Sequence, residues 1–188
     1  MNEWFLSRLV VLVPLILSLS VHEWAHAWMA FRLGDDTAML QGRLSLDPLV
    51  HIDPVGTVLL PLFGVPIGWA KPVPVNPMRF RKVSASLGMA LVAAAGPASN
   101  LALAMLAFGV HTVLPGGPVR DAVFGMVFLN VALAVFNLLP IPPLDGSRIA
   151  DHWMPRSLRS TWDSLGTVGP FVLVGLAVFL YFWLSVDY

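Results

Sequence analysis

Residues 20–30 read SVHEWAHAWMA, and residues 22–26 within that stretch fit an H-E-x-x-H pattern. On a helix, side chains four residues apart lie on one face, so His22 and His26 can hold one metal ion between them. Glu23 projects beside the pair, where it can accept a proton from a water that the metal activates. The bare pattern also arises by chance, so the surrounding sequence decides how it is interpreted.

The pattern lies inside a long hydrophobic run. Between residues 4 and 31, the only ionisable side chain besides His22, Glu23 and His26 is that of Arg8. At about 1.5 Å per residue, such a run is long enough for a tilted helix to cross a membrane. Ionisable groups deep in a membrane helix are costly, and they indicate a functional site. The alternative is a polar cluster that only fastens neighbouring helices together.

The composition is that of an integral membrane protein. Of the 188 residues, 57% are hydrophobic and 12% are charged, whereas about a quarter of a soluble domain is charged. The formal net charge is zero and there is no basic run, so we expect a lipid bilayer and no nucleic acid as partner. The chain has no cysteine, which excludes disulfides and leaves His, Asp and Glu as strong metal ligands.

The apolar runs predict an all-α polytopic membrane protein with about four transmembrane helices in a single domain over residues 1–188. The expected helices span about 4–33, 84–114, 121–139 and 164–185. The second of these is rich in alanine and glycine, so we expect it at the centre of the bundle. Asp35 and Asp36, which follow the first helix, are interpreted as a solvated helix end rather than as metal ligands.

Residues 37–83 predict a membrane-associated strand and re-entrant loop between the first and second helices. Residues 41–46 alternate polar and apolar side chains, as a short strand does. Residues 55–69 are apolar, but the run is short and carries prolines and glycines such as Pro61, so it cannot span the hydrocarbon as a helix. Irregular backbone at membrane depth requires packing against protein. Residues 71–77 then return as extended surface chain.

Two further polar positions leave alternatives open. Asp145 follows an apolar helix and three prolines, at a turn with Gly146. It can reach back as a third, oxygen ligand, or it can be a loop carboxylate that caps the next helix. Asn100 lies within the second expected helix, where an interhelical hydrogen bond and a catalytic contact are equally compatible with the sequence.

Topology and charge favour the same arrangement. For Asp145 to reach the histidines, the first and third helices must run parallel, as they do if residues 55–69 do not span. One face then holds nine Lys and Arg residues, and the other holds only Arg8 and Arg120. We therefore expect a multi-pass protein of a bacterial cell membrane, with both termini extracytoplasmic and the metal site toward the cytoplasm.

Taken together, these motifs resemble the site-2 protease family of intramembrane zinc metalloproteases. The resemblance rests on residues 22–26, on Gly96-Pro97-Ala98-Ser99-Asn100 and on residues 137–146. Residues 46–56 resemble the membrane-associated strand region of the family. The similarity extends from the first helix through Gly146, and we expect a minimal member without a PDZ insertion or a cystathionine-β-synthase-type domain.

The resemblance implies one Zn²⁺ per chain, with His22, His26 and Asp145 as its ligands and Glu23 as the general base. It makes Asn100 and Asn137 candidates for holding the substrate backbone or the oxyanion.

The implied partner is a transmembrane protein substrate, cleaved in regulated intramembrane proteolysis. Such a substrate must unwind locally, and residues 41–70 could hold it extended by edge pairing. No oligomeric state is predicted.

Two other functions would also use buried His, Glu and Asp side chains. An ion-translocating protein would carry polar residues along several helices, whereas here they cluster at one depth. A non-catalytic metal-binding membrane scaffold would have no need of Glu23 between its histidines.

Overall fold

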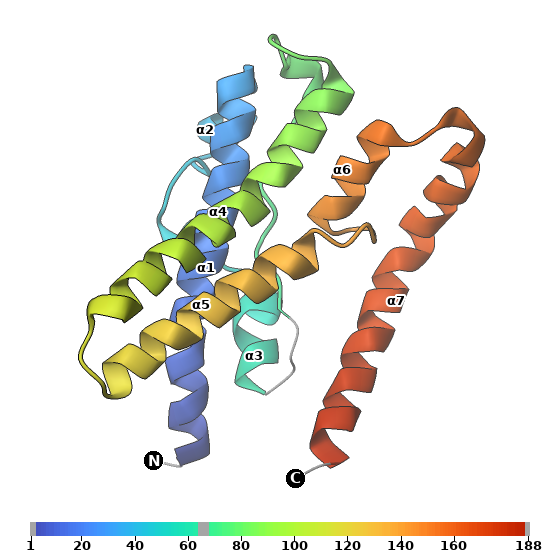
Figure 1. The fold of residues 1–188 in the computed structure, drawn as a ribbon. Helices are drawn as coiled ribbons and strands as arrows, with labels where there is room; N and C mark the ends of the chain where they lie inside the picture. Colours follow the sequence, from blue (N-terminus) through green and yellow to red (C-terminus); the bar gives the residue numbers. More distant parts are fainter. Residues whose placement is uncertain (1–2, 64–67, 187–188) are drawn as a thin grey trace.

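Four long helices form where the sequence holds its long apolar runs (Figure 1). The computed structural model describes residues 3–63 and 68–186. Its long helices are α1 (Glu3–Leu33), α4 (Ala85–Val113), α5 (Pro118–Asn137) and α7 (Arg159–Val186). The shorter helical elements are α2 (Thr37–Leu40), η1 (Pro48–Val50), η2 (Pro54–Leu59), α3 (Leu60–Leu62), η3 (Pro77–Arg79), α6 (Asp145–Trp153) and η4 (Arg156–Leu158). The expected all-α fold is confirmed.

Helix α4 is the central element, and it packs against α1, α5 and α6. Its buried positions are mostly small residues, including Ala90, Ala93, Gly96 and Ala104, which let neighbouring helices approach closely. The chain runs along α1, reverses in α4 and reverses again in α5 (Figure 1). The end of α5 and the start of α6 are thereby brought back beside the middle of the molecule.

The strand predicted for residues 41–46 is wrong. In the described part of the chain no residue is in a strand, and this stretch forms turns and bends. Gly42, with a φ of +68°, ends α2: its N–H donates to Met39 O, and the N–H of Arg43 donates to Ala38 O. The Arg43 side chain then turns inward and donates to Lys71 O. The polar–apolar alternation therefore reflects a helix cap and one buried arginine.

The following segment is also more helical than expected. Residues 54–62 form a π-helical stretch and then α3, and residues 64–67 lie outside the described residues. The chain leaves the C-terminal end of α1 and later returns to that end. The N–H of Asn76 donates to Asp35 Oδ2, and the N–H of Arg81 donates to Leu33 O. A re-entrant path through a membrane stays a prediction.

The interpretation of Asp35 as part of a solvated helix end is wrong. Its side chain is fully buried and accepts hydrogen bonds from Thr37 N and Thr37 Oγ1 as well as from Asn76 N. It fastens the returning chain to the end of α1. Asp36, in contrast, pairs with Arg79 at an exposed position.

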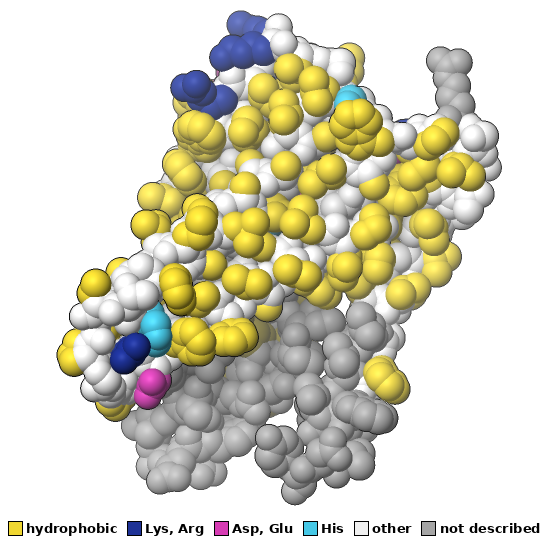
Figure 2. Space-filling model, viewed as in Figure 1, with side chains coloured by type: hydrophobic (Ala, Val, Ile, Leu, Met, Phe, Trp, Pro, Cys, Tyr) yellow, Lys and Arg dark blue, Asp and Glu magenta, His cyan; other side chains and the backbone are white. Residues whose placement is uncertain are grey.

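Within the described residues, the helices α4 and α5 are long and apolar enough to cross a membrane. On the face shown in Figure 2, hydrophobic side chains cover the middle of the molecule, and Lys and Arg side chains gather at its upper end, with one more at the lower left. The start of α1 and the end of α7 lie at the same end of the molecule (Figure 1). The four-span topology and its orientation stay predictions.

Candidate metal centre

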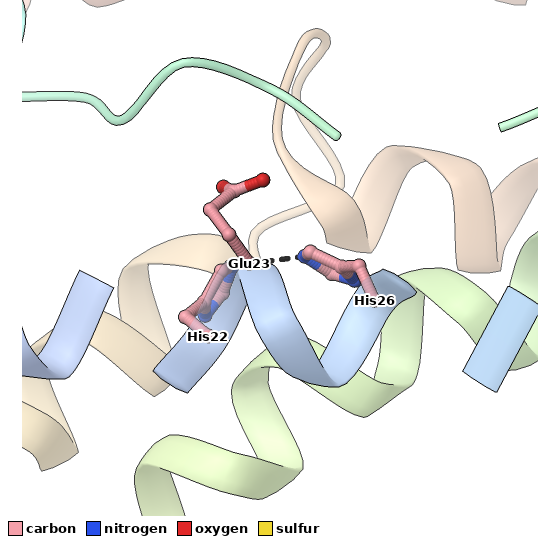
Figure 3. Close-up of side chains that lie close together, drawn as sticks. All are labelled: His22, Glu23 and His26. Atoms are coloured by element: carbon pink, nitrogen blue, oxygen red, sulfur yellow. Dashed lines mark hydrogen bonds between the residues drawn. The ribbon is translucent and has the colours of Figure 1, made fainter. Parts of the chain in front are cut away.

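Three potential ligand atoms converge between α1 and α6. His22 and His26 lie on one face of α1, both buried, and their Nε2 atoms are 3.0 Å apart (Figure 3). Asp145 is the first residue of α6, and its Oδ2 lies 3.1 Å from His22 Nε2 and 3.3 Å from His26 Nε2. The structure thus brings together three residues that are far apart in the sequence.

Asp145 does not cap the helix that it begins. The N-cap residue of α6 is Leu144, and no side chain caps that helix end. The backbone turns that follow α5 instead direct the carboxylate toward the histidines. Burial alone would raise the pKa of Asp145, but the adjacent ring nitrogens of His22 and His26 outweigh it and hold that pKa below its usual range. The group is therefore an ionised carboxylate at neutral pH.

The arrangement fits a metal ion. The Nδ1 atom of His22 donates to Asn100 Oδ1 (2.6 Å), and Nδ1 of His26 donates to Val92 O (2.7 Å). Both Nε2 atoms are then directed at each other and at Asp145 Oδ2, a buried atom without a hydrogen-bond partner among the described residues. One proton can occupy only one edge of this triangle, whereas a cation satisfies all three corners. Tetrahedral zinc with bonds of about 2.0–2.1 Å places its ligands about 3.3 Å apart, close to the observed spacing.

Helix α4 can approach the two imidazoles because residue 96 is glycine. A Cβ at Gly96 would lie 2.4 Å from His26 Nε2 and 2.6 Å from His22 Cε1. Val92 O and Asn100 Oδ1, about one turn of α4 before and after Gly96, are the acceptors that fix the Nδ1 atoms of the two rings. The Gly-Pro-Ala-Ser-Asn motif thus packs directly against the two histidine rings of α1.

Glu23 lies next to the histidine pair and is held by a different part of the chain. The carboxylate extends away from the two rings (Figure 3), and ligand atoms of the three side chains all lie within 4.8 Å of one another. Its Oε2 accepts a hydrogen bond of 3.0 Å from the N–H of Val73. Val73 lies between Pro72 and Pro74, which have no N–H, so this is the single backbone donor of the triplet.

A cavity of about 360 Å³ opens beside these groups. Its walls come from α1, residues 68–75, α4, α5 and α6, and Asn137 is among the lining residues. The Asn137 amide donates to Leu133 O in its own helix. Asn100 is fully buried behind His22 and does not line the cavity. Of the two asparagines that the resemblance offers for substrate contacts, the structure therefore brings only Asn137 to the cavity.

The sequence did not single out three of the supporting groups. The N–H of Val73 could have been noticed, because a Pro-x-Pro triplet leaves one donor. The carbonyl of Val92 has no sequence signal, since any residue offers one. Asn130, which contacts Asn100, was visible only as a polar exception in an apolar helix. His51 and His152 lie elsewhere and bond to Ser45 O and Ser86 Oγ.

Comparison with known proteins places these features among metalloproteases. A family model described as Peptidase family M50 matches residues 117–181. "Putative zinc metalloprotease YwhC" of Bacillus subtilis is 40% identical over 178 residues, covering 89% of this chain and 80% of that protein. "Putative zinc metalloprotease Rip2" of Mycobacterium tuberculosis H37Rv is 33% identical, covering 90% of this chain and 65% of that protein. No solved structure gives a significant match.

Proposed function

The chain belongs to peptidase family M50, the site-2 protease family, and on that premise we propose that it is a zinc endopeptidase that cleaves transmembrane substrate proteins. The observation that carries the proposal is the convergence of His22, His26 and Asp145 beside a cavity that Glu23 adjoins. A metal-binding scaffold would require the three ligands but neither the cavity nor the adjacent carboxylate.

His22, His26 and Asp145 would hold the zinc ion through two nitrogens and one oxygen, a donor set typical of catalytic zinc. When bound, zinc supplies a Lewis acid that lowers the pKa of water and polarises the scissile carbonyl. The protein contributes buried, pre-oriented ligands. The hydrogen bonds to Asn100 and Val92 keep both rings turned with Nε2 toward Asp145, as second-shell partners of metal sites do.

Glu23 would serve as the general base and then as the general acid. Its carboxylate takes a proton from the attacking water and passes that proton to the leaving amine nitrogen. The Val73 N–H holds Oε2, so the carboxylate has a defined position beside the histidine pair. Asn137, at the cavity wall, is proposed to contact the substrate backbone.

The substrate would be a transmembrane segment that has unwound locally, because the peptide bonds of an intact helix are shielded by its own hydrogen bonds. Residues 41–46 form no strand, so edge pairing there is not part of the proposal. The extended chain that does line the cavity lies between Trp69 and Val75. We place the unwound substrate beside this chain, where its scissile bond can approach Glu23.

The decisive experiment is co-expression with single-pass membrane proteins, comparing wild type with Glu23→Gln. The variant should accumulate uncut substrate while binding about one zinc per chain, because an amide cannot accept the proton of water. Asp163→Asn is the matched control, since it makes the same change of carboxylate to amide at an exposed position of α7. Cleavage by Glu23→Gln at the wild-type rate would exclude Glu23 as the base.

The proposed topology has four spans, with both termini extracytoplasmic and the metal site toward the cytoplasm. Because the chain has no cysteine, single cysteines can be introduced at Met78, Gly116 or Ser157 without interference. A membrane-impermeant thiol reagent added outside sealed cells should label only Gly116→Cys, in the α4–α5 connection. Labelling of Met78→Cys from outside would require a further crossing before α4, contrary to the proposal.

A further inference from the structure

Three polar side chains lie behind His22 and link α1, α4 and α5. They are Ser18, Asn100 and Asn130, here named the asparagine network. Both asparagines are fully buried, and Ser18 is 1% exposed. Neither Ser18 nor Asn130 contributes an atom to the triangle of ligand atoms or a wall to the cavity. Buried polar groups in an apolar helix bundle are costly unless they are bonded, so their arrangement calls for an explanation.

The hydrogen bonds of the network have a fixed direction, which begins at Asn130. Its Nδ2 donates to Met126 O (2.9 Å) and to Ser18 Oγ (3.0 Å). A carbonyl oxygen can only accept, so the nitrogen of the Asn130 amide must face Met126. The oxygen of that amide therefore faces Asn100.

The orientation of the Asn100 amide is fixed in the same way. Asn100 Nδ2 donates to Asn130 Oδ1 (2.9 Å) and to Ser18 O (3.4 Å), so the Asn100 oxygen faces His22. The Asn100 oxygen lies 2.6 Å from His22 Nδ1. Because this oxygen can only accept, His22 Nδ1 must carry the hydrogen of the bond. A neutral His22 with its proton on Nδ1 has a lone pair on Nε2, the atom that faces Asp145.

We propose that Asn130 is a positioning residue, which through Asn100 fixes the tautomer of His22 and thereby the affinity of the site for zinc. The inference rests on the proposed function only in taking zinc as the ion, and it makes no use of proteolysis. Ser18 supports the same arrangement through its hydroxyl and its carbonyl. Helix α5 thus determines, through Asn130, which ring nitrogen of His22 carries the proton. The next helix, α6, begins with a second proposed ligand, Asp145.

The consequence of removing Asn130 follows from the side-chain torsion of Asn100, which can exchange the positions of its amide oxygen and nitrogen. In Asn130→Leu, Asn100 Nδ2 loses its 2.9 Å acceptor and keeps only the long bond of 3.4 Å to Ser18 O. The Asn100 amide is then held less firmly and can turn its nitrogen toward His22 Nδ1. That orientation favours the tautomer with hydrogen on Nε2, so the ring nitrogen that faces Asp145 has no lone pair for a metal. Zinc affinity should fall about 10- to 100-fold, the usual range for loss of an outer partner of a metal-binding histidine.

Asn130→Asp separates this effect from a loss of packing. A protonated aspartic acid has nearly the same shape as asparagine: its hydroxyl can donate to Met126 O and its other oxygen can accept from Asn100. Zinc affinity should therefore stay within about threefold of wild type. Ser18→Ala should weaken zinc binding less than Asn130→Leu, because Met126 O still orients Asn130. Ser20→Ala is the matched control: Ser20 is buried on the same helix, and its hydroxyl donates only to Ile16 O.

The experiment uses the full chain purified in detergent and stripped of metal. The dissociation constant for zinc is measured by competition with a chelator of known affinity. The ¹⁵N chemical shifts of His22 in the metal-free protein report which ring nitrogen carries the proton. We expect Asn130→Leu to weaken zinc binding and to shift that proton to Nε2, with Asn130→Asp and Ser20→Ala close to wild type.

Each outcome decides for or against the inference. Wild-type affinity in Asn130→Leu, or an equal loss in Asn130→Leu and Asn130→Asp, overturns it. If Asn130→Leu does not fold, a tighter zinc affinity in Ser20→Ala than in Ser18→Ala supports the inference, and equal values overturn it. A wild-type protein that binds zinc and follows this pattern but cleaves no substrate would refute the proposed function and leave the positioning role of Asn130 standing.

Discussion

The two sides of the candidate site are held in different ways. On the metal side, His22 and His26 are fixed from behind by the asparagine network and by Val92 O, all buried between helices. On the base side, Glu23 is held by one backbone N–H from a proline-rich loop. The first side depends on helix packing, and the second depends on the path of a loop. Metal affinity and proton transfer should therefore respond to different substitutions.

The largest effect is expected from removal of a ligand. Asp145→Ala and His26→Ala should each reduce bound zinc from about one per chain to nearly none, because two remaining ligands hold zinc poorly. Proteolysis should be lost as well. Metal analysis of detergent-purified protein measures the change. Full zinc content in both variants would show that the ligand set is different.

The next effect sharpens the role of helix packing on the metal side. Gly96→Ala places a methyl group against both imidazoles, which their hydrogen bonds prevent from moving freely. We expect zinc affinity to fall about 100-fold. Gly109→Ala is the matched control: Gly109 lies on the same helix, and a Cβ there would meet no atom within 4 Å. Equal zinc affinity in the two variants would mean that the α1–α4 contact adjusts without cost to the site.

The role of the hydrogen bond between the Val73 N–H and Glu23 can be tested by removing the N–H. Val73→Pro deletes the N–H that binds Glu23, at a position that prolines already flank on both sides. We expect kcat to fall about 10- to 100-fold through misplacement of the base, with zinc content unchanged. Val73→Ala keeps the N–H and should retain activity. If Val73→Pro cleaves as fast as Val73→Ala, or faster, the hydrogen bond does not serve catalysis.

The smallest effect concerns the anchor of that loop. Asp35→Asn weakens the acceptor of Asn76 N and Thr37, which fastens the returning chain to α1. A loss of about 1–2 kcal/mol in the free energy of unfolding is expected, with kcat reduced about twofold and zinc affinity unchanged. Thermal unfolding and a chelator competition measure the two quantities. A zinc affinity that falls with stability would mean that the two sides of the site are coupled.

This division also explains which features could be predicted from the sequence. The positions of the long helices followed from apolar runs, and the pairing of His22 with His26 followed from helical spacing. The approach of Asp145 was open in the residues alone, because a loop carboxylate after prolines has several possible directions. The strand predicted for residues 41–46 is wrong because a buried arginine and a helix-capping glycine produce the same polar–apolar alternation as a strand. The Pro-x-Pro triplet marks the N–H of Val73 as its one backbone donor, but the contact with Glu23 depends on the tertiary placement of the loop, which no local pattern indicates.

The order of these residues along the chain has a consequence for biosynthesis. The histidines of α1 are made first, and Asn100, Asn130 and Asp145 follow in that order. A partly inserted chain therefore holds two imidazoles with neither the network that orients His22 nor the carboxylate that completes the proposed ligand set. Zinc would be acquired only after α5 and the turn behind it have reached their places. Metal loading would then report correct insertion, and the newly made chain would lack the complete proposed ligand set until its own assembly is finished.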